Sequence, residues 1–268
     1  MAKVRWWNTS LGKEEVQRIE TAIMNGRVSQ GAVTVEFETE LAKAIEVPFV
    51  VATTSGSVAL LLAVWANGIG RDDEVIVPNR TFAATAHAAM MLGAKIVLVD
   101  TIAAAPIIDA AKITAKLTRR TKAIMPVQLN GRASDMATIR SIAAEHGLKI
   151  IEDAAQALFS KHPLGYLGTL GDAGGYSLGM TKLLQTGQGG AVATRSPEIY
   201  ERLQLLRNHG VGGDSFSVSY QQLGCNFKFT DVQAAIGVVQ LTRMPARIER
   251  LNDIYRQYEQ GLADLPLI

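Results

Sequence analysis

Short apolar runs alternate with helix-like segments along most of this chain. Runs of strand length lie at 49–54, 74–78, 95–100, 121–127 and 148–153. The spacing of apolar residues predicts helices at 12–26, 55–68, 82–93, 134–147 and 196–210. Short, fully apolar strands that alternate with helices are typical of a mainly parallel sheet covered on both faces. We therefore predict an α/β fold in which a mainly parallel sheet lies between helices.

Two of the predicted helices carry local start and stop signals. Ser134 is expected to cap the start of one of them, and Gly147 follows its end. Ser196 is expected to cap another, with Pro197 at its first position and Gly210 as its stop. These signals give the expected boundaries of both helices.

In sheets of this kind, ligands bind beyond the carboxyl ends of the strands, so the residues after each strand are the first candidates for a site. "SGSVAL" follows the first strand and leads into a helix. Such a turn presents free backbone N–H groups at the positive end of the helix dipole, which suits an anion. Ser55, Ser57 and the N–H of Val58 would suit a phosphate. An ordinary capped helix start is the alternative interpretation.

Three later strand ends carry further candidates. Phe82 could lie over a flat ligand ring or pack in the core. Asp153 ends an apolar strand, so it is either a buried carboxylate that needs a partner or a helix cap. Lys182 lies in "LGMTKLL", and a desolvated lysine loses its proton more easily and attacks carbonyl groups. A lysine that extends to solvent is the alternative.

Taken together, these four strand ends describe a single ligand. It has a phosphate, a flat ring, a ring atom that favours a neighbouring anion, and a carbonyl that reacts with lysine. Pyridoxal 5'-phosphate (PLP) has all four features, since its enzymes use a lysine and a carboxylate near the pyridine nitrogen.

Composition and charge exclude other classes of protein. The 268 residues carry a formal net charge of +2, and no dense basic tract indicates a nucleic-acid partner. The one cysteine, Cys225, and four scattered histidines give no metal-binding spacing. No run of about 18 apolar residues predicts a membrane span, so a cytoplasmic location is expected. "GIGRDD" lacks the third glycine of a dinucleotide fingerprint, which disfavours a nicotinamide dehydrogenase.

The sequence resembles the DegT/DnrJ/EryC1/StrS family of PLP-dependent sugar aminotransferases, which have the aspartate aminotransferase fold (fold type I). The resemblance runs from "LGKEEVQRIETAIMNGRVSQG" to "NFKFTDVQAAIGVVQL", nearly the whole chain. It is carried by "SGSVAL", "VPNRTFAATAHA", "IIEDAAQAL", "GDAGGYSLGMTKLLQTGQGG", "LRNHGV" and "LGCNFKFTDVQAAIGVVQL".

The resemblance implies a role for each matching residue. Lys182 is similar to the lysine that holds the cofactor covalently and moves the proton, and Asp153 to the acid that keeps the pyridine nitrogen protonated. Gln156 matches a residue near the phenolic oxygen, and Phe82 matches the aromatic stacked on the ring.

Four further matches concern the cofactor's phosphate: Ser57, Val58, Ser177 and Asn226. Asn226 is similar to an asparagine that reaches the phosphate from the neighbouring subunit, so a homodimer with shared active sites is implied. The family chemistry would move an amino group from an amino acid, glutamate in most members, to a nucleotide-linked keto-sugar. Such products belong to cell-surface polysaccharides or secondary metabolites.

Several positions depart from the family pattern. Gln128 and Asn130 stand where a histidine and an aromatic are usual, Gln188 replaces an acid, and no aromatic follows Ser177. We expect these changes to lie beside the site and to affect which sugar binds.

The resemblance also divides the chain. Residues 1–240 are expected to form the PLP-binding large domain with an N-terminal helical segment. Residues 241–268 are expected to form a connecting helix and the start of an incomplete C-terminal small domain. A non-catalytic or regulatory relative, or a fragment, is therefore an alternative function. A PLP-dependent sugar dehydratase is a second alternative, which Lys182 disfavours because those members carry histidine there.

Overall fold

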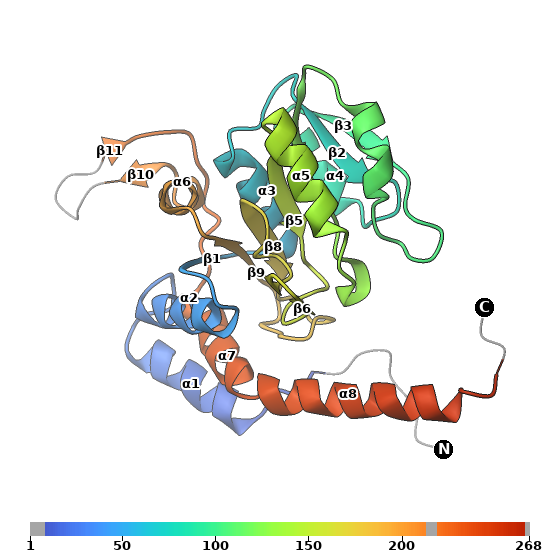
Figure 1. The fold of residues 1–268 in the computed structure, drawn as a ribbon. Coiled ribbons are helices and arrows are strands. Elements are labelled where there is room, and N and C mark those ends of the chain that lie inside the picture. Colours follow the sequence, from blue (N-terminus) through green and yellow to red (C-terminus); the bar gives the residue numbers. More distant parts are fainter. Residues whose placement is uncertain (1–8, 213–218, 266–268) are drawn as a thin grey trace.

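The computed structural model describes residues 9–212 and 219–265 and has a seven-stranded central sheet. Its strands lie in the order β1-β9-β8-β5-β4-β2-β3 (Figure 1). Their bounds are β1 Phe49–Thr53, β2 Glu74–Pro78, β3 Lys95–Val99, β4 Thr121–Ile124, β5 Lys149–Asp153, β8 Ala173–Ser177 and β9 Gly190–Thr194. Strand β9 runs antiparallel to both of its neighbours, and the other neighbouring pairs are parallel. The predicted α/β fold with a mainly parallel sheet is confirmed.

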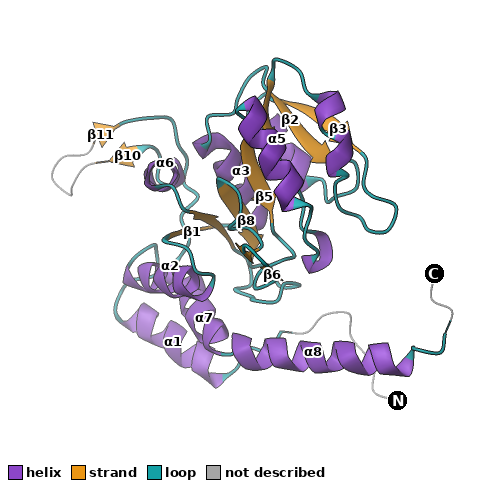
Figure 2. Ribbon diagram, viewed as in Figure 1, coloured by secondary structure: helices purple, strands orange, loops and turns teal. Residues whose placement is uncertain are grey.

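The helices cover both faces of this sheet (Figure 2). Their bounds are α1 Lys13–Met24, α2 Ala32–Ala44, α3 Gly56–Ala66, α4 Ala84–Met90, α5 Met136–His146, α6 Pro197–Arg207, α7 Asp231–Thr242 and α8 Met244–Gly261. Helices α3, α4 and α6 contribute to one buried cluster, and α2, α5 and α7 to the other. The sheet therefore lies between two apolar layers.

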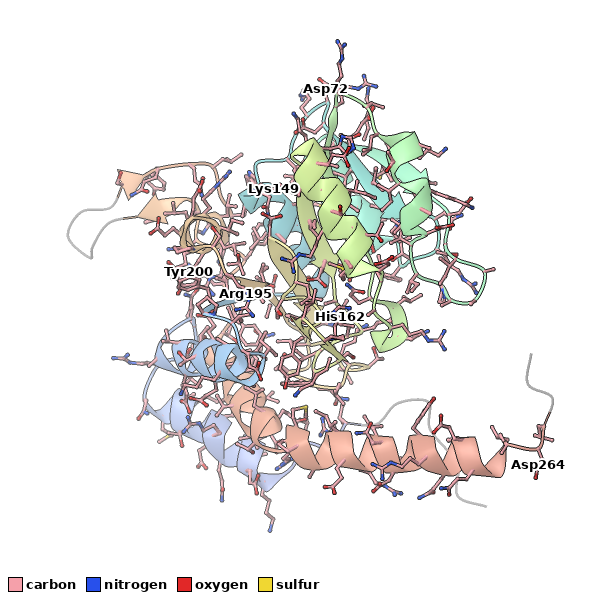
Figure 3. The ribbon with its side chains drawn as sticks, viewed as in Figure 1. Asp72, Lys149, His162, Arg195, Tyr200 and Asp264 are labelled. Carbon is pink, nitrogen blue, oxygen red and sulfur yellow. The ribbon has the colours of Figure 1, made fainter. Side chains whose placement is uncertain are left out.

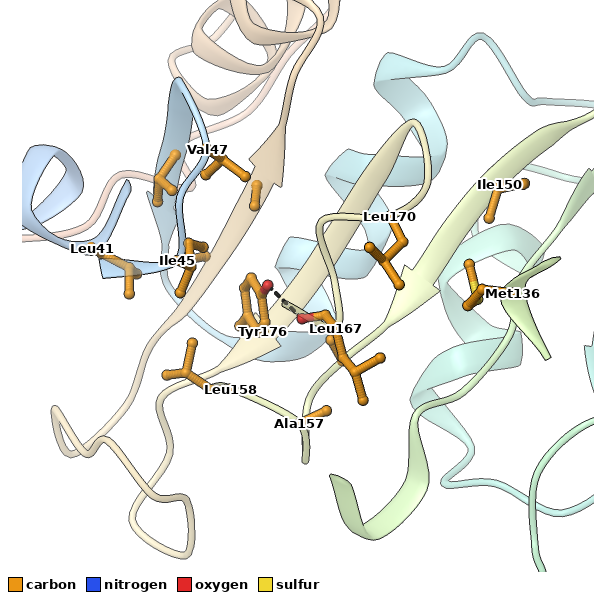
Figure 4. Packing of buried hydrophobic residues seen from close by; sticks show 14 of the residues in the cluster. Leu41, Ile45, Val47, Met136, Ile150, Ala157, Leu158, Leu167, Leu170 and Tyr176 are labelled. Carbon is orange, nitrogen blue, oxygen red and sulfur yellow. Dashed lines mark hydrogen bonds between the residues drawn. The ribbon is translucent and has the colours of Figure 1, made fainter. Parts of the chain in front are cut away.

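Two small sheets and several 3-10 turns lie outside the central sheet. Two-stranded sheets pair β6 Lys161–His162 with β7 Gly165–Tyr166, and β10 Val211–Gly212 with β11 Ser219–Tyr220. Single 3-10 turns are η1 Ala110–Lys112, η2 Thr114–Lys116 and η3 Leu129–Gly131. The loop between β7 and β8 folds back onto the sheet, where the Tyr176 hydroxyl donates to the Leu167 carbonyl at 2.7 Å (Figure 4).

The predicted helix boundaries hold in part. Ser196 accepts a hydrogen bond from the Ile199 N–H, and Pro197 begins α6, as predicted. Gly147 has the left-handed φ of 63° expected after α5. The prediction for Ser134 is wrong, because Asp135 caps α5 by accepting from the Thr138 N–H at 3.0 Å.

Helix α8 leaves the body after α7 and ends apart from the sheet (Figure 1). Its side chains are largely exposed, and Asp264 lies at the far end (Figure 3). Only Met244, at its start, is fully buried among the α8 residues. The part of α8 near Met244 therefore anchors this helix to the rest of the protein.

Candidate active site

The turn between β1 and α3 lies at the carboxyl edge of the sheet. Ser55 caps α3, and its Oγ accepts from the Val58 N–H at 3.2 Å. Ser57 is exposed in the first turn of α3, whose opening N–H groups have no carbonyl one turn earlier. The turn is thus a capped helix start, and the exposed Ser57 and the helix dipole still give it the character of an anion site.

Two glycines let this turn approach the sheet closely. A Cβ on Gly56 would lie 2.7 Å from the Cβ of Ser177, and a Cβ on Gly190 would lie 2.3 Å from the carbonyl oxygen of Ser55. The register pairs Thr53 and Ser177, the last residues of β1 and β8, with the same residue, Gly190. Ser177 therefore lies directly beside Gly56, the first residue of α3 and the one before Ser57.

Asp153 ends β5 at the same edge and is only 5% exposed. The Thr85 hydroxyl donates to its Oδ2 at 2.6 Å, and the Ala155 N–H donates to its Oδ1 at 3.1 Å. Burial raises the pKa of Asp153, whereas these bonds and the charge of Lys182 oppose the rise. Since no helix follows Asp153 before α6 in the described chain, the helix-cap interpretation is wrong.

Lys182 lies in the turn after β8, where its N–H donates to the Gly179 carbonyl at 2.9 Å. The side chain is half-buried, so it does not simply extend into solvent. Burial lowers the pKa of Lys182, and the charge of Asp153 opposes that change. The amine of Lys182 and the carboxyl group of Asp153 therefore lie close enough for the charge of each to affect the pKa of the other.

Phe82 precedes α4 and is 74% exposed, so the alternative of a core aromatic is wrong. Its carbonyl accepts from the Thr85 N–H at 3.1 Å, which places Phe82 one turn from the residue that binds Asp153. An exposed aromatic beside a buried carboxylate at a sheet edge is available to a flat ligand.

Gln156 and Asn226 are both exposed. The Gln156 Oε1 accepts from the Asn130 N–H at 3.0 Å, and the Asn226 Oδ1 accepts from the Lys228 N–H at 3.4 Å. Within the described chain, no hydrogen bond joins either residue to Asp153 or Lys182. The roles of Gln156 and Asn226 toward the cofactor therefore stay predictions.

Sequence reasoning missed Thr85, which holds Asp153 and also shares a hydrogen bond of 2.7 Å with Thr81. The available signal was weak. Both threonines lie within "NRTFAATAHA", on either side of Phe82 and one helical turn apart.

Gln128 adjoins Asp153 through its backbone, because its N–H donates to the Asp153 carbonyl at 2.9 Å. Its side chain is fully buried and donates to the Glu152 Oε2 at 2.7 Å. Glu152 also accepts from the N–H groups of Gly168, Leu170 and Gly171. Neighbouring residues of a strand point to opposite faces, so Glu152 and Gln128 support the loop on the far side of β5 from Asp153.

Residues 9–212 and 219–265 contain neither a metal-binding cluster nor a membrane-spanning helix. No group of three or more histidine, cysteine, aspartate or glutamate side chains there could hold a metal ion. No helix in those ranges is both long and apolar enough to cross a bilayer.

Comparison with known proteins gives relatives along nearly the whole chain. The spore coat polysaccharide biosynthesis protein SpsC of Bacillus subtilis is 34% identical over 96% of this chain and 68% of its own length. The GDP-perosamine synthase of Caulobacter vibrioides is 39% identical over 88% of this chain and 64% of its own length. The chain thus spans about two thirds of these curated relatives.

Solved structures show the same likeness. The PLP form of the putative sugar aminotransferase Spr1654 from Streptococcus pneumoniae superposes with a TM-score of 0.92 at 26% identity. That match covers 97% of this chain and 72% of the other. The sequence profile of the DegT/DnrJ/EryC1/StrS aminotransferase family matches residues 9–268. The chain therefore belongs to the DegT/DnrJ/EryC1/StrS aminotransferase family, as its motifs predict.

Proposed function

We propose that this chain forms the cofactor-binding part of a PLP-dependent aminotransferase that acts on a nucleotide-linked keto-sugar. The observation that carries the proposal is that buried Asp153, at the end of β5, and half-buried Lys182, in the turn after β8, lie at the same carboxyl edge of the sheet, where the charge of each opposes the effect of burial on the other's pKa. Membership of an aminotransferase family supports the reaction class.

The residues at this edge fit PLP. The close approach of Gly56 to Ser177 leaves a turn of backbone N–H groups and hydroxyls suited to a phosphate, with Ser57 and Val58 in the first turn of α3. Phe82 is free to cover the ring. The Asp153 carboxylate can hold a proton on the pyridine nitrogen, because its negative charge favours the charged ring. Bound PLP would act as an electron sink for the reacting carbon.

Lys182 has the chemistry required of the reacting amine. Its lowered pKa increases the neutral fraction of the amine near neutral pH, and the neutral amine is the nucleophile. Once free of the cofactor, the same amine can take up and return a proton at the substrate carbon as general base and acid.

The remaining candidates have roles that depend on substrate or on a second subunit. Gln156 would lie near the phenolic oxygen of the cofactor. Asn226 is exposed, which suits a residue that reaches the phosphate of a neighbouring subunit in a homodimer. We further propose that residues 1–240 form the cofactor-binding domain and that α8, Met244–Gly261, is the connecting helix.

The names of the relatives support the substrate class. One is a GDP-perosamine synthase and another takes part in polysaccharide biosynthesis. An amino acid, with glutamate as the first candidate, would supply the nitrogen, and a nucleotide-linked keto-sugar would accept it. We also propose a cytoplasmic location for this reaction.

Borohydride trapping tests the proposal directly. Protein incubated with PLP and then reduced should carry the cofactor covalently on Lys182, as read by peptide mass spectrometry. Lys182→Ala should abolish the label. Lys149→Ala is the matched control, because Lys149 begins β5 at the opposite edge of the sheet and pairs with Asp172. Labelling of another lysine, or none in a folded protein, would overturn the assignment.

A further inference from the structure

The connecting helix α8 donates a side-chain hydrogen bond to the lysine segment. The Arg247 Nη1 donates to the carbonyl oxygen of Leu183 at 2.6 Å, and Leu183 is the residue directly after Lys182. The Nη2 of the same guanidinium donates to the Ser10 Oγ, in the segment before α1. Arg247 therefore joins three parts of the chain that are far apart in sequence.

Arg247 occupies an electrostatically unfavourable place. It lies in the first turn of α8, at the positive end of the helix dipole, where a cation is disfavoured. Burial and the neighbouring Arg243 charge lower the pKa of Arg247. Arg243 is itself paired with Glu14 and Glu15. The charge of Glu15 and the hydrogen bonds to Leu183 and Ser10 offset the unfavourable position of Arg247.

Packing places the lysine segment between the core and α8. Leu184 is fully buried, and Leu183 and Ile248 pack against the same apolar cluster. The backbone of residues 182 and 183 makes two hydrogen bonds in the described structure. The Lys182 N–H donates to Gly179 within the turn, and the Leu183 carbonyl accepts from Arg247 of α8. A shift in this backbone would change how deeply the Lys182 side chain is buried.

We propose that Arg247 is a positioning residue for Lys182, which fixes the lysine segment to the connecting helix. The inference rests on the proposed function of Lys182 but concerns a contact that exists in the protein without cofactor. Loss of the contact loosens the segment and exposes the amine. Because burial is what lowers the pKa of Lys182, exposure returns that pKa toward its ordinary value.

Hydrogen exchange in the cofactor-free protein tests the structural half. Arg247→Met should speed amide exchange in the peptide spanning 179–186 by about tenfold, the factor expected for losing one hydrogen bond that limits local opening. Arg250→Met is the matched control: Arg250 lies one turn further along α8, is exposed, and makes no hydrogen bond or ion pair to another described residue. It should leave exchange in that peptide unchanged.

Borohydride trapping across a pH series tests the functional half. In Arg247→Met, the pH of half-maximal PLP attachment to Lys182 should rise by about half a unit, since about threefold less neutral amine is then present at a given pH. Arg247→Lys keeps a positive charge and one donor, so it should give an intermediate shift. This conservative variant also serves if Arg247→Met does not fold.

The outcomes separate the two proposals. If the unaltered protein takes no label at Lys182, the proposed function fails whatever Arg247 does. If the unaltered protein is labelled but the Arg247 variants match it in pH profile and in exchange of 179–186, the positioning role is wrong. Faster exchange together with a raised pH midpoint supports it.

Discussion

The buried carboxyl group of Asp153 depends on a short chain of hydroxyl groups. Thr85 donates to Asp153 at 2.6 Å and is itself hydrogen-bonded to Thr81 at 2.7 Å. That bond helps to keep Asp153 ionised, because it opposes the rise in pKa that burial causes. Thr85 thus prepares the charge that a pyridinium ring would need.

Replacing Thr85 with valine removes the donor but keeps the shape of the side chain. A hydrogen bond to a charged group contributes about 1.5–3 kcal/mol, so PLP should bind roughly 10- to 100-fold more weakly. Spectroscopic titration with PLP measures the change. Thr39→Val is the control, since Thr39 is exposed on α2 and bonds only its own helix, at Val35. Equal affinities in all three proteins would show that Thr85 does not support the site.

The charge of Asp153 should also set the reactivity of Lys182. That charge raises the pKa of Lys182 and burial lowers it, so Asp153→Asn should lower the pKa further. In the cofactor-free Asp153→Asn variant, acylation of Lys182 by a small amine-reactive acylating reagent should therefore reach half its maximal rate at a lower pH than in the unaltered protein. Mass spectrometry of the Lys182 peptide gives the rates.

Lys149, paired with Asp172 at the other edge of the sheet, provides the internal reference in the same samples. Its acylation profile should not move. A Lys182 profile that stays in place or moves to higher pH would contradict the prediction that the charge of Asp153 raises the pKa of Lys182.

The elements that were predictable from the sequence are those whose signals are local. Alternating apolar runs identified β1 to β5, and the residues after β1 and at the end of β5 marked the edge where Ser57 and Asp153 lie. The order of strands in the sheet and the antiparallel β9 could not be predicted, because "GAVAT" is short and begins with glycine. Partners in a sheet are also chosen by tertiary contacts.

Helix α2 shows why a helix can be missed. Its start, Gly31, has no capping side chain, and the N–H groups of Gly31 and Thr34 instead donate to Asp231 at 2.8 and 2.9 Å. Its buried face also includes the polar residues Thr34 and Glu38, which obscures the helical pattern of apolar positions. The capping residue lies 200 positions away in the sequence, so the residues around 31 alone cannot predict that a helix begins there.

Removing this distant cap should destabilise the protein strongly. Asp231 is fully buried and also accepts from the Thr34 hydroxyl at 2.7 Å, so Asp231→Ala leaves several buried donors unpaired. We expect a loss of about 2–4 kcal/mol in the free energy of unfolding. Asp135→Ala removes the exposed cap of α5 and should cost only about 0.5–2 kcal/mol. Urea unfolding compares the two, and equal losses would contradict the argument from burial.

One ion pair connects the N-terminal helices, the sheet and α6 at the scale of the whole molecule. Glu38 of α2 and Arg207 of α6 form a hydrogen-bonded pair that is almost fully buried. The Ala52 N–H donates to Glu38 at 2.7 Å, and Arg207 donates to the Ala52 carbonyl at 2.9 Å. Since Ala52 lies three residues before Ser55, the pair also supports the strand that leads into the proposed phosphate turn.

Breaking this pair should make stability depend on pH in a defined direction. Burial raises the pKa of Glu38, and Arg207 opposes the rise, so Arg207→Met should raise that pKa further above the value in the unfolded chain. A carboxyl group with a raised folded pKa stabilises the fold when protonated, and this contribution is lost as pH rises through the folded pKa. The variant should therefore lose about 3–5 kcal/mol at pH 8 and clearly less near pH 5.

Two further variants decide whether the unpaired charge is the cause. Arg207→Met combined with Glu38→Leu removes the stranded carboxyl group, so it should recover much of the stability and lose the added pH dependence, because apolar replacement of both partners leaves no buried charge. Arg195→Met is the control, since Arg195 is exposed and donates only to the Glu46 carbonyl. Urea unfolding at both pH values gives the comparison. A single variant whose destabilisation is the same at pH 5 and pH 8 would mean that α6 and α2 are held together by packing and that Glu38 is not the group left unpaired.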